Sequence, residues 1–231
     1  MREAALLYLS RDFLLNIDMI EGIRRSEADI LYAGDNGVLV RFKARPLMAI
    51  SADTAGDAIE ILNAAGGVED DIIVHPVEQI DEICAAFGLK EVFERFYNCV
   101  FTKPVPEPTA DIRPLGPEYA EFVTANYEHA DIDYIQGRIK TGNLFGVFAD
   151  DKLAGFVGEH IEGSMGMLEV LPEYRRRGLG SQLDYFNIRR ERDMGHVPFG
   201  QIIITNDLSV KMHGGMGAVI SDKVSGWIGR E

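Results

Sequence analysis

"MLEVLPEYRRRGLGSQLDYF" (residues 167–186) joins a predicted strand to a predicted helix through an arginine-glycine turn, residues 175–180. The strand is expected to stop at Pro172, because proline lacks an amide hydrogen for a ladder. The helix is expected to begin near Leu179, and the first amides of any helix have no partner within it. Those amides lie at the positive end of the helix dipole, where anions bind. The stretch therefore predicts a phosphate-binding turn.

The glycines and arginines of this turn suit that role. Gly178 and Gly180 have no Cβ, so an anion could come close to the amides. The three arginines add permanent positive charge and forked donors. The turn is not a Walker loop, because no Gly-Lys-Ser/Thr follows, and Leu183 stands where a dinucleotide fold would have its third glycine. The alternative is a basic surface turn capped by glycine, with no ligand.

Composition limits the class of protein. A chain of 231 residues that is 46% hydrophobic can build one large or two small domains. A net charge of −14 argues against a nucleic-acid partner, which demands clustered Lys and Arg. No apolar run reaches the roughly 18 residues of a membrane span, so we expect no membrane partner. Cys84 and Cys99 lie in apolar stretches without a signal segment, which favours the reducing cytoplasm over a disulfide or a reactive thiol.

A proline-rich stretch divides the chain. Five of the nine prolines fall within residues 103–117, and proline suits neither a helix interior nor a central strand. We therefore predict two domains, residues 1–105 and 106–231. The first 25 residues are expected to form one docking amphipathic helix, since apolar side chains recur there at helical spacing.

The two halves show the same predicted order of elements. The second half reads as a strand and two helices, then a hairpin that turns at Asp150-Asp151, then strand, helix, strand, helix and strand. Its later elements are predicted at residues 164–172, 179–194, 199–206, 207–217 and 218–228.

The first half repeats the second from the hairpin onward. Its hairpin should turn at Asn36-Gly37. Its later elements are predicted at residues 45–51, 54–67, 70–75, 76–88 and 92–103. We predict an α/β (α+β) fold with a mixed central sheet flanked by helices. The first half would be a smaller, degenerate copy without the anion site.

The motif letters resemble a known family. The spacing Arg175-x-x-Gly178-x-Gly180 resembles the pyrophosphate signature of the GCN5-related N-acetyltransferase (GNAT) superfamily. A second signature of that family is matched in register by Asn206, Ser209, Met212, His213, Met216 and Gly217. The resemblance covers roughly residues 109–231, so it implies a GNAT-like C-terminal domain.

The resemblance implies coenzyme A carrying an acyl group, most simply acetyl-CoA, as co-substrate, and no metal. The pantetheine arm would lie along the strand that ends near Val170, and the pyrophosphate would lie on the amides of residues 176–181. The residues implied to bind the co-substrate are Leu168, Val170, Leu171, Arg175, Arg176, Arg177, Gly178, Leu179, Gly180, Ser181, Asn206 and Ser209.

The family's chemistry is direct attack of an amine on the thioester. An amine with a pKa near 10.4 is protonated at neutral pH, so a base must remove a proton. Glu169 and Glu162 are the candidate bases, with solvent as the alternative; the family often has an acid at about the position of Ser164. His213 stands where the family has a tyrosine that protonates the departing sulfur, and its alternative is a surface histidine.

The acceptor is expected to be a small molecule. Within the superfamily the sequence also resembles the glycine N-acyltransferase and FR47-like branch, which implies a small amine or an amino acid. An acidic surface suits a cationic acceptor. The alternative function is a CoA or acyl-CoA binding or sensing protein without turnover. We allow for a homodimer.

Overall fold

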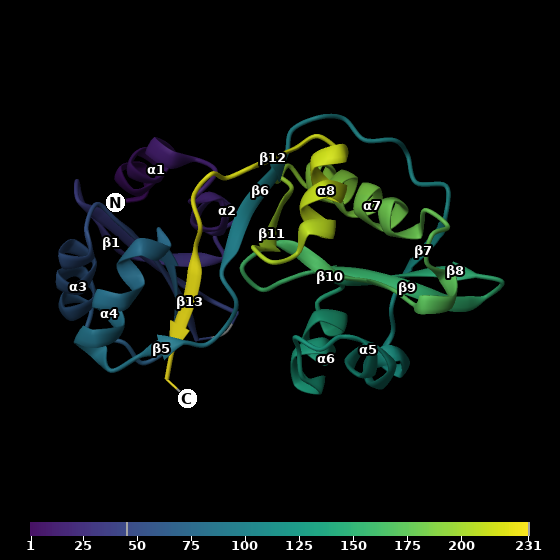
Figure 1. Cartoon of the computed structure of the whole chain (residues 1–231), viewed down its shortest axis with the longest axis horizontal. Coiled ribbons are helices and arrows are strands. Elements are labelled where there is room, and N and C mark those ends of the chain that lie inside the picture. The colour runs from purple at the N-terminus through teal and green to yellow at the C-terminus, as the bar shows by residue number, and fades with distance from the viewer. Residues whose placement is uncertain (45, 231) are drawn as a thin grey trace. The chain divides into compact units, whose positions relative to one another are not determined.

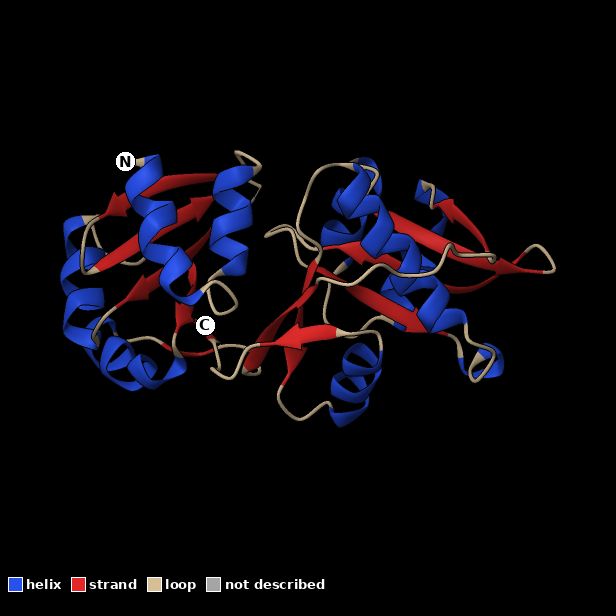
Figure 2. Cartoon of the chain, turned by 90° about the horizontal axis from the view of Figure 1, so that it is seen from above, coloured by secondary structure: helices blue, strands red, loops and turns tan. Residues whose placement is uncertain are grey.

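The computed structural model describes residues 1–44 and 46–230, which form two compact units (Figure 1). Unit 1 holds residues 1–102 and 199–231, and unit 2 holds residues 103–198. The domain boundary predicted between residues 105 and 106 stays a prediction. Helices flank strands in both units, which confirms the predicted α/β class (Figure 2). Arg45, the first residue of one predicted strand, and Glu231 lie outside the described residues.

The N-terminal segment of unit 1 is not the single helix that the apolar spacing predicts. It forms α1 (Arg2–Leu9), a 3-10 turn η1 (Ser10–Asp12) and α2 (Ile17–Arg24). The Asn16 side-chain amide donates to the carbonyls of Leu9 and Asp12 at 3.2 and 3.1 Å. Such side-chain bonds compete with the helix for backbone groups, so the first helix ends and a second begins.

A six-stranded mixed sheet forms the centre of unit 1, in the order β1-β2-β3-β4-β13-β5. Its strands are β1 (Ala28–Ala33), β2 (Gly37–Phe42), β3 (Leu47–Ala52), β4 (Asp71–His75), β5 (Lys90–Glu91) and β13 (Gly226–Gly229). Helices α3 (Ala55–Ala64) and α4 (Ile80–Phe87), the latter preceded by η2 (Val77–Gln79), share one apolar core with this sheet. The predicted first hairpin is confirmed, but Gly34 and Gly37 close its turn by a backbone hydrogen bond of 3.0 Å, so the predicted turn is displaced by one residue.

The last strands of the two predicted repeats exchange places. The single strand predicted over residues 218–228 is wrong, since β12 (Ala218–Ile220) ends before β13 begins. Strand β13 pairs antiparallel with β4, beside the N-terminal strands (Figure 1), whereas β6 (Phe96–Phe101) pairs antiparallel with β11 (Phe199–Ile203) and β12. Each repeat therefore receives its closing strand from the other.

A buried polar triad anchors the exchanged strand within unit 1. Asp18, His75 and Ser225 are all 0% exposed. The Nε2 of His75 lies 3.0 Å from a carboxylate oxygen of Asp18, and its Nδ1 lies 2.6 Å from the Ser225 hydroxyl. Because Ser225 precedes β13 directly, the triad ties that strand to β4 and α2.

Unit 2 contains four antiparallel strands in the order β10-β9-β8-β7. They are β7 (Asp111–Pro114), β8 (Leu144–Ala149), β9 (Lys152–Glu159) and β10 (Met165–Val170). Helices α5 (Ala120–Asn126), which follows η3 (Pro117–Tyr119), and α6 (Ile132–Lys140) pack on one face, and α7 (Leu179–Asp193) packs on the other (Figure 1). Asp150 and Asp151, both at positive φ, form the predicted hairpin turn. Among the described residues, no helix combines the length and apolarity needed to cross a membrane.

Candidate functional site

Strand β10 carries a bulge shortly before the arginine-glycine turn. Gly166 pairs with Gly158 of β9, and Glu169 pairs with Phe156. Two residues of β10 therefore lie opposite one residue of β9. The first of them, Met167, has a φ of 52°, which is uncommon for a residue with a side chain. A bulge bends its strand and takes backbone groups out of the ladder, and bulges are frequent beside active sites.

The arginine-glycine turn brings a row of amides to the start of α7. A 3-10 turn η4 (Pro172–Tyr174) follows β10, and α7 begins at Leu179, as predicted. Within the part of the chain that the structure describes, the backbone amides of residues 176–181 meet no acceptor, and the first turn of α7 holds no acidic side chain. A Cβ placed on Gly178 would meet no atom within 4 Å. The space before these amides is therefore open to an anion.

Two arginines of the turn differ in their engagement. Arg177 donates to the carbonyl of Glu173 at 3.0 Å and lies over the ring of Tyr174. Arg176 adopts a φ of 62° and makes no ion pair or hydrogen bond with the other described residues. Arg176 is thus the guanidinium of the turn that can meet an anion without first leaving a partner.

Glu169 binds the third arginine. Its Oε1 accepts from Arg175 Nη2 at 3.0 Å and from the amide of Val170 at 3.1 Å. Its side chain is 31% exposed, so it is not the buried carboxylate that its apolar neighbours suggest. A carboxylate in a strand requires a partner, and for Glu169 this partner is Arg175 of the arginine-glycine turn.

Glu162 is the more buried of the two candidate bases. It lies in the loop between β9 and β10, not on a strand, and only 3% of it is exposed. The Ser164 hydroxyl donates to Glu162 Oε1 at 2.6 Å, and Ser164 occupies about the position where the family often has an acid. A carboxylate can accept about four hydrogen bonds. Glu162 has this single donor among the described residues, which leaves it able to accept from a substrate.

Two tyrosines lie near Glu162 that the sequence analysis missed. Burial raises the pKa of the Tyr127 hydroxyl to about 12, the charge of Glu162 adds to the rise, and a hydrogen bond with the Met167 backbone opposes it. Burial and Glu162 also raise the pKa of Tyr134, whose hydroxyl lies 2.8 Å from His160 Nδ1. Both phenols come from the segment of α5 and α6, and no local sequence signal places them beside the loop 160–164.

The apolar residues predicted to line the pantetheine arm pack against α7. Leu168 and Val170 contact the cluster that includes Leu183 of α7, and Leu171 is buried. The amide of Leu171 donates to Ala154 of β9 at 3.0 Å. Because backbone groups of successive strand residues point to opposite sides, the N–H and C=O of Val170 point away from β9.

The remaining predicted residues belong to α8 (Asp207–Gly215) of unit 1. Asn206 caps this helix by accepting from the Ser209 amide at 3.0 Å. The Ser209 hydroxyl lies 3.2 Å from His213 Nδ1, and the His213 ring meets Phe101 edge to face. The structure thus connects these three residues with one another within unit 1, whereas the arginine-glycine turn lies in unit 2.

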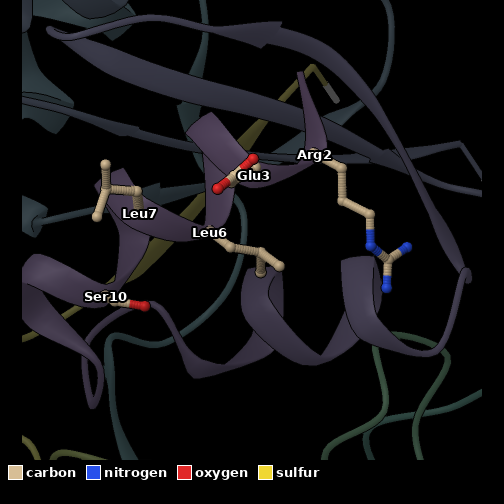
Figure 3. A pocket seen from close by; sticks show the side chains of 5 residues that line it. All are labelled: Arg2, Glu3, Leu6, Leu7 and Ser10. Atoms are coloured by element: carbon tan, nitrogen blue, oxygen red, sulfur yellow. The ribbon is translucent and has the colours of Figure 1, made fainter.

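A surface hollow lies along the N-terminal helix of unit 1 (Figure 3). It is lined by Arg2, Glu3, Leu6, Leu7 and Ser10. All of these residues belong to α1 or to the first position of η1. The hollow therefore does not bring together polar groups from different elements, as a binding site usually does. Among the described residues, no three His, Cys, Asp or Glu side chains are grouped so that they could hold a metal ion.

Known proteins resemble this chain in sequence and in fold. Residues 111–213 match the sequence model of the acetyltransferase (GNAT) family. No curated protein matches the sequence. A Drosophila protein of known structure is 18% identical, with a TM-score of 0.67 over 98% of this chain and 94% of that one. A protein described as a GNAT-family acetyltransferase, from Novosphingobium aromaticivorans, is 19% identical, with a TM-score of 0.58 over 93% and 96%. A GCN5-related N-acetyltransferase from Kribbella flavida is 12% identical, with a TM-score of 0.58 over 94% and 95%. At these identities the structural likeness concerns the fold.

Proposed function

Because residues 111–213 match the sequence model of the acetyltransferase (GNAT) family, we propose that this chain is an acyl-CoA-dependent N-acetyltransferase. It would transfer an acetyl group from acetyl-CoA to a primary amine of a small molecule or amino acid. The observation that carries the proposal is the row of amides of residues 176–181, which meet no acceptor among the described residues. These amides and Arg176 would hold the pyrophosphate.

The bulged strand β10 would hold the rest of the co-substrate. The N–H and C=O of Val170 point away from β9, where they can bind the amide groups of a pantetheine arm. The bulge at Met167 removes backbone groups from the ladder near the same edge. Such fixed donors can stabilise the oxyanion that develops on the thioester carbonyl.

We assign the general base to Glu162. The amine nitrogen forms a bond to the thioester carbon, its proton passes to the carboxylate, and the carbon–sulfur bond breaks with the electron pair leaving on sulfur. Glu162 is favoured because it has one donor, Ser164, whereas Glu169 is bound to Arg175 and to Val170. The sulfur must then gain a proton, and His213 stays the predicted donor. Asn206 and Ser209 likewise stay predicted contacts of the co-substrate.

The acceptor is proposed to be a small amine, and a cationic one by preference. The net charge of −14 attracts cations to the protein surface. The negative charge of Glu162, which also acts on Tyr127 and Tyr134, favours an ammonium group nearby. Resemblance to the glycine N-acyltransferase branch supports a small acceptor over a protein tail.

Calorimetry with CoA and acetyl-CoA, followed by a thiol-release assay, tests this function. We expect binding of both, and release of CoA with at least one member of a panel of amino acids, polyamines and monoamines. Binding without release above background across the panel would favour the sensing protein. Absence of binding would overturn the anion-site argument altogether.

Gly180→Asp should separate folding from binding at the turn. A Cβ on Gly180 meets only Val170 Cγ2, at 3.8 Å, so the side chain fits. An acid in the first turn of a helix stabilises it by about 0.3–1 kcal/mol. The same carboxylate would repel a diphosphate, and we expect affinity for CoA to fall at least about tenfold.

The control for this change is Gly180→Ala, which adds a methyl group without charge, so affinity for CoA should fall less than in Gly180→Asp. Thermal unfolding and calorimetry are measured on both variants. Equal affinity for CoA in Gly180→Asp and in the parent protein would show that no anion binds at these amides.

A further inference from the structure

Both backbone polar groups of Val170 are already occupied by side chains of the chain itself. The amide donates to Glu169 Oε1 at 3.1 Å, and the carbonyl accepts from Arg175 Nε at 2.8 Å. Glu169 and Arg175 are joined in turn by an ion pair of 3.0 Å. Two side chains thus close a ring over the last residue of β10, on the side that faces away from β9.

This ring covers groups that the proposed function needs. A pantetheine arm requires the backbone of Val170, and a diphosphate at the arginine-glycine turn gains from Arg175. A carboxylate is itself an oxyanion, so Glu169 offers these donors the same kind of acceptor that a phosphate would offer. The charge of Glu169 also offsets the charge of one arginine in the turn.

The ring is held weakly enough to open. The side chains of Arg175 and Glu169 are 56% and 31% exposed. Ion pairs between exposed side chains contribute little to stability, and the phosphates of a ligand can exceed that contribution through several charge-assisted hydrogen bonds. Opening needs rotation of two side chains and no change in the backbone.

We propose that Glu169 is an internal competitor of acyl-CoA and sets the affinity of the turn for it. This inference rests on the proposed function. In the free protein the carboxylate holds Arg175 and the amide of Val170, and the incoming co-substrate displaces it. The same carboxylate favours release of CoA after transfer, since it returns to its donors. Glu169 is therefore a residue that tunes binding and not the base.

Calorimetry with CoA on Glu169→Gln tests the competition. Glutamine keeps the size of the side chain but lacks the charge, so it should hold Arg175 less firmly. We expect the Kd for CoA to fall about three- to tenfold, because the ion pair that must be broken and the repulsion of phosphate are both removed. The shift should become smaller when Arg175 is replaced by Gln in both proteins, because the ion pair then no longer contributes to it.

The matched control is Glu173→Gln. Glu173 lies in η4 near the turn. Arg177 donates to its backbone carbonyl, and its side chain makes no hydrogen bond or ion pair with the other described residues. This variant changes the net charge equally, so we expect less than a twofold change in Kd. An equal gain of affinity for CoA in both variants would mean that the change in net charge alone causes it, and would overturn the competition.

Two failures can be told apart. If the parent protein binds CoA and Glu169→Gln binds it no more tightly, the competition is wrong and the proposed function stands. If neither protein binds CoA, the proposed function falls and the competition falls with it. Thermal unfolding of each variant shows whether a weaker Kd reflects loss of folded protein.

Discussion

Glu162→Gln is expected to lower kcat about 100- to 10,000-fold, the range that general bases contribute, while the Kd for acetyl-CoA stays unchanged. Glutamine keeps the contact with the Ser164 hydroxyl but cannot accept a proton from an ammonium group. The arginine-glycine turn lies outside the loop 160–164, which is why the affinity for acetyl-CoA should not respond. Steady-state kinetics with a saturating amine, together with calorimetry, measure the two effects separately.

The pH dependence of this loss identifies it as loss of a base. An amine with a pKa of about 10.4 loses its own proton as the pH approaches that value. The deficit of Glu162→Gln should therefore shrink steadily between pH 7 and pH 10.5. Because burial raises the pKa of Tyr127 to about 12, this phenol keeps its proton over the whole range and does not contribute to the profile.

The control is Glu173→Gln, an exposed acid outside the loop, which should keep kcat within about twofold. A large loss of kcat in Glu169→Gln, with no loss of kcat in Glu162→Gln, would assign the general base to Glu169 instead. A small loss in both variants would mean that solvent takes the proton, or that no transfer to an amine occurs.

The arginine-glycine turn could be located from the sequence because its signals are local. Pro172 ends the strand, Gly178 precedes the helix, and α7 begins at Leu179 as predicted. The fold of Arg175 back onto Glu169 could not be predicted in the same way. A long side chain in an exposed turn has many rotamers, and its partner is chosen by the completed structure.

Features set by long-range pairing escaped the sequence analysis. The run of residues 218–228 reads as one strand, yet its two ends join different sheets, because β4 and β6 each need a neighbour. The bulge at Met167 depends on the register with β9, which alternation of apolar residues does not reveal. Tyr127 comes near that bulge only through tertiary packing, so the residues next to it in the sequence give no sign that it lies there.

His75→Ala is expected to lower the free energy of unfolding of unit 1 by about 3–5 kcal/mol, because the buried Asp18 carboxylate loses the partner that compensates its charge. The geometry satisfies all three side chains when Nε2–H donates to Asp18 and Nδ1 accepts from the Ser225 hydroxyl. Alanine leaves the Asp18 carboxylate buried with one donor, the Met19 amide.

Trp227 makes this measurement specific. It is the only tryptophan of the chain and lies on β13, beside the triad, so its fluorescence reports unfolding of unit 1 in urea. Ile72→Val on β4, the strand that carries His75, is the control, because it removes one buried methylene group and should cost about 0.5–1.5 kcal/mol. A cost for His75→Ala no larger than this would show that the triad adds nothing beyond packing.

The coupling between the triad members decides whether they act as a unit. Ser225→Ala removes one hydroxyl and should cost about 1 kcal/mol, since the backbone of Ser225 remains paired with Phe96. Combining His75→Ala with Asp18→Ala should cost less than the sum of the two single changes, by about 0.5–3 kcal/mol, because the second removes the carboxylate that the first leaves unpaired. Strict additivity would mean that the strand exchange is held by the ladder of β4 and β13 without help from these side chains.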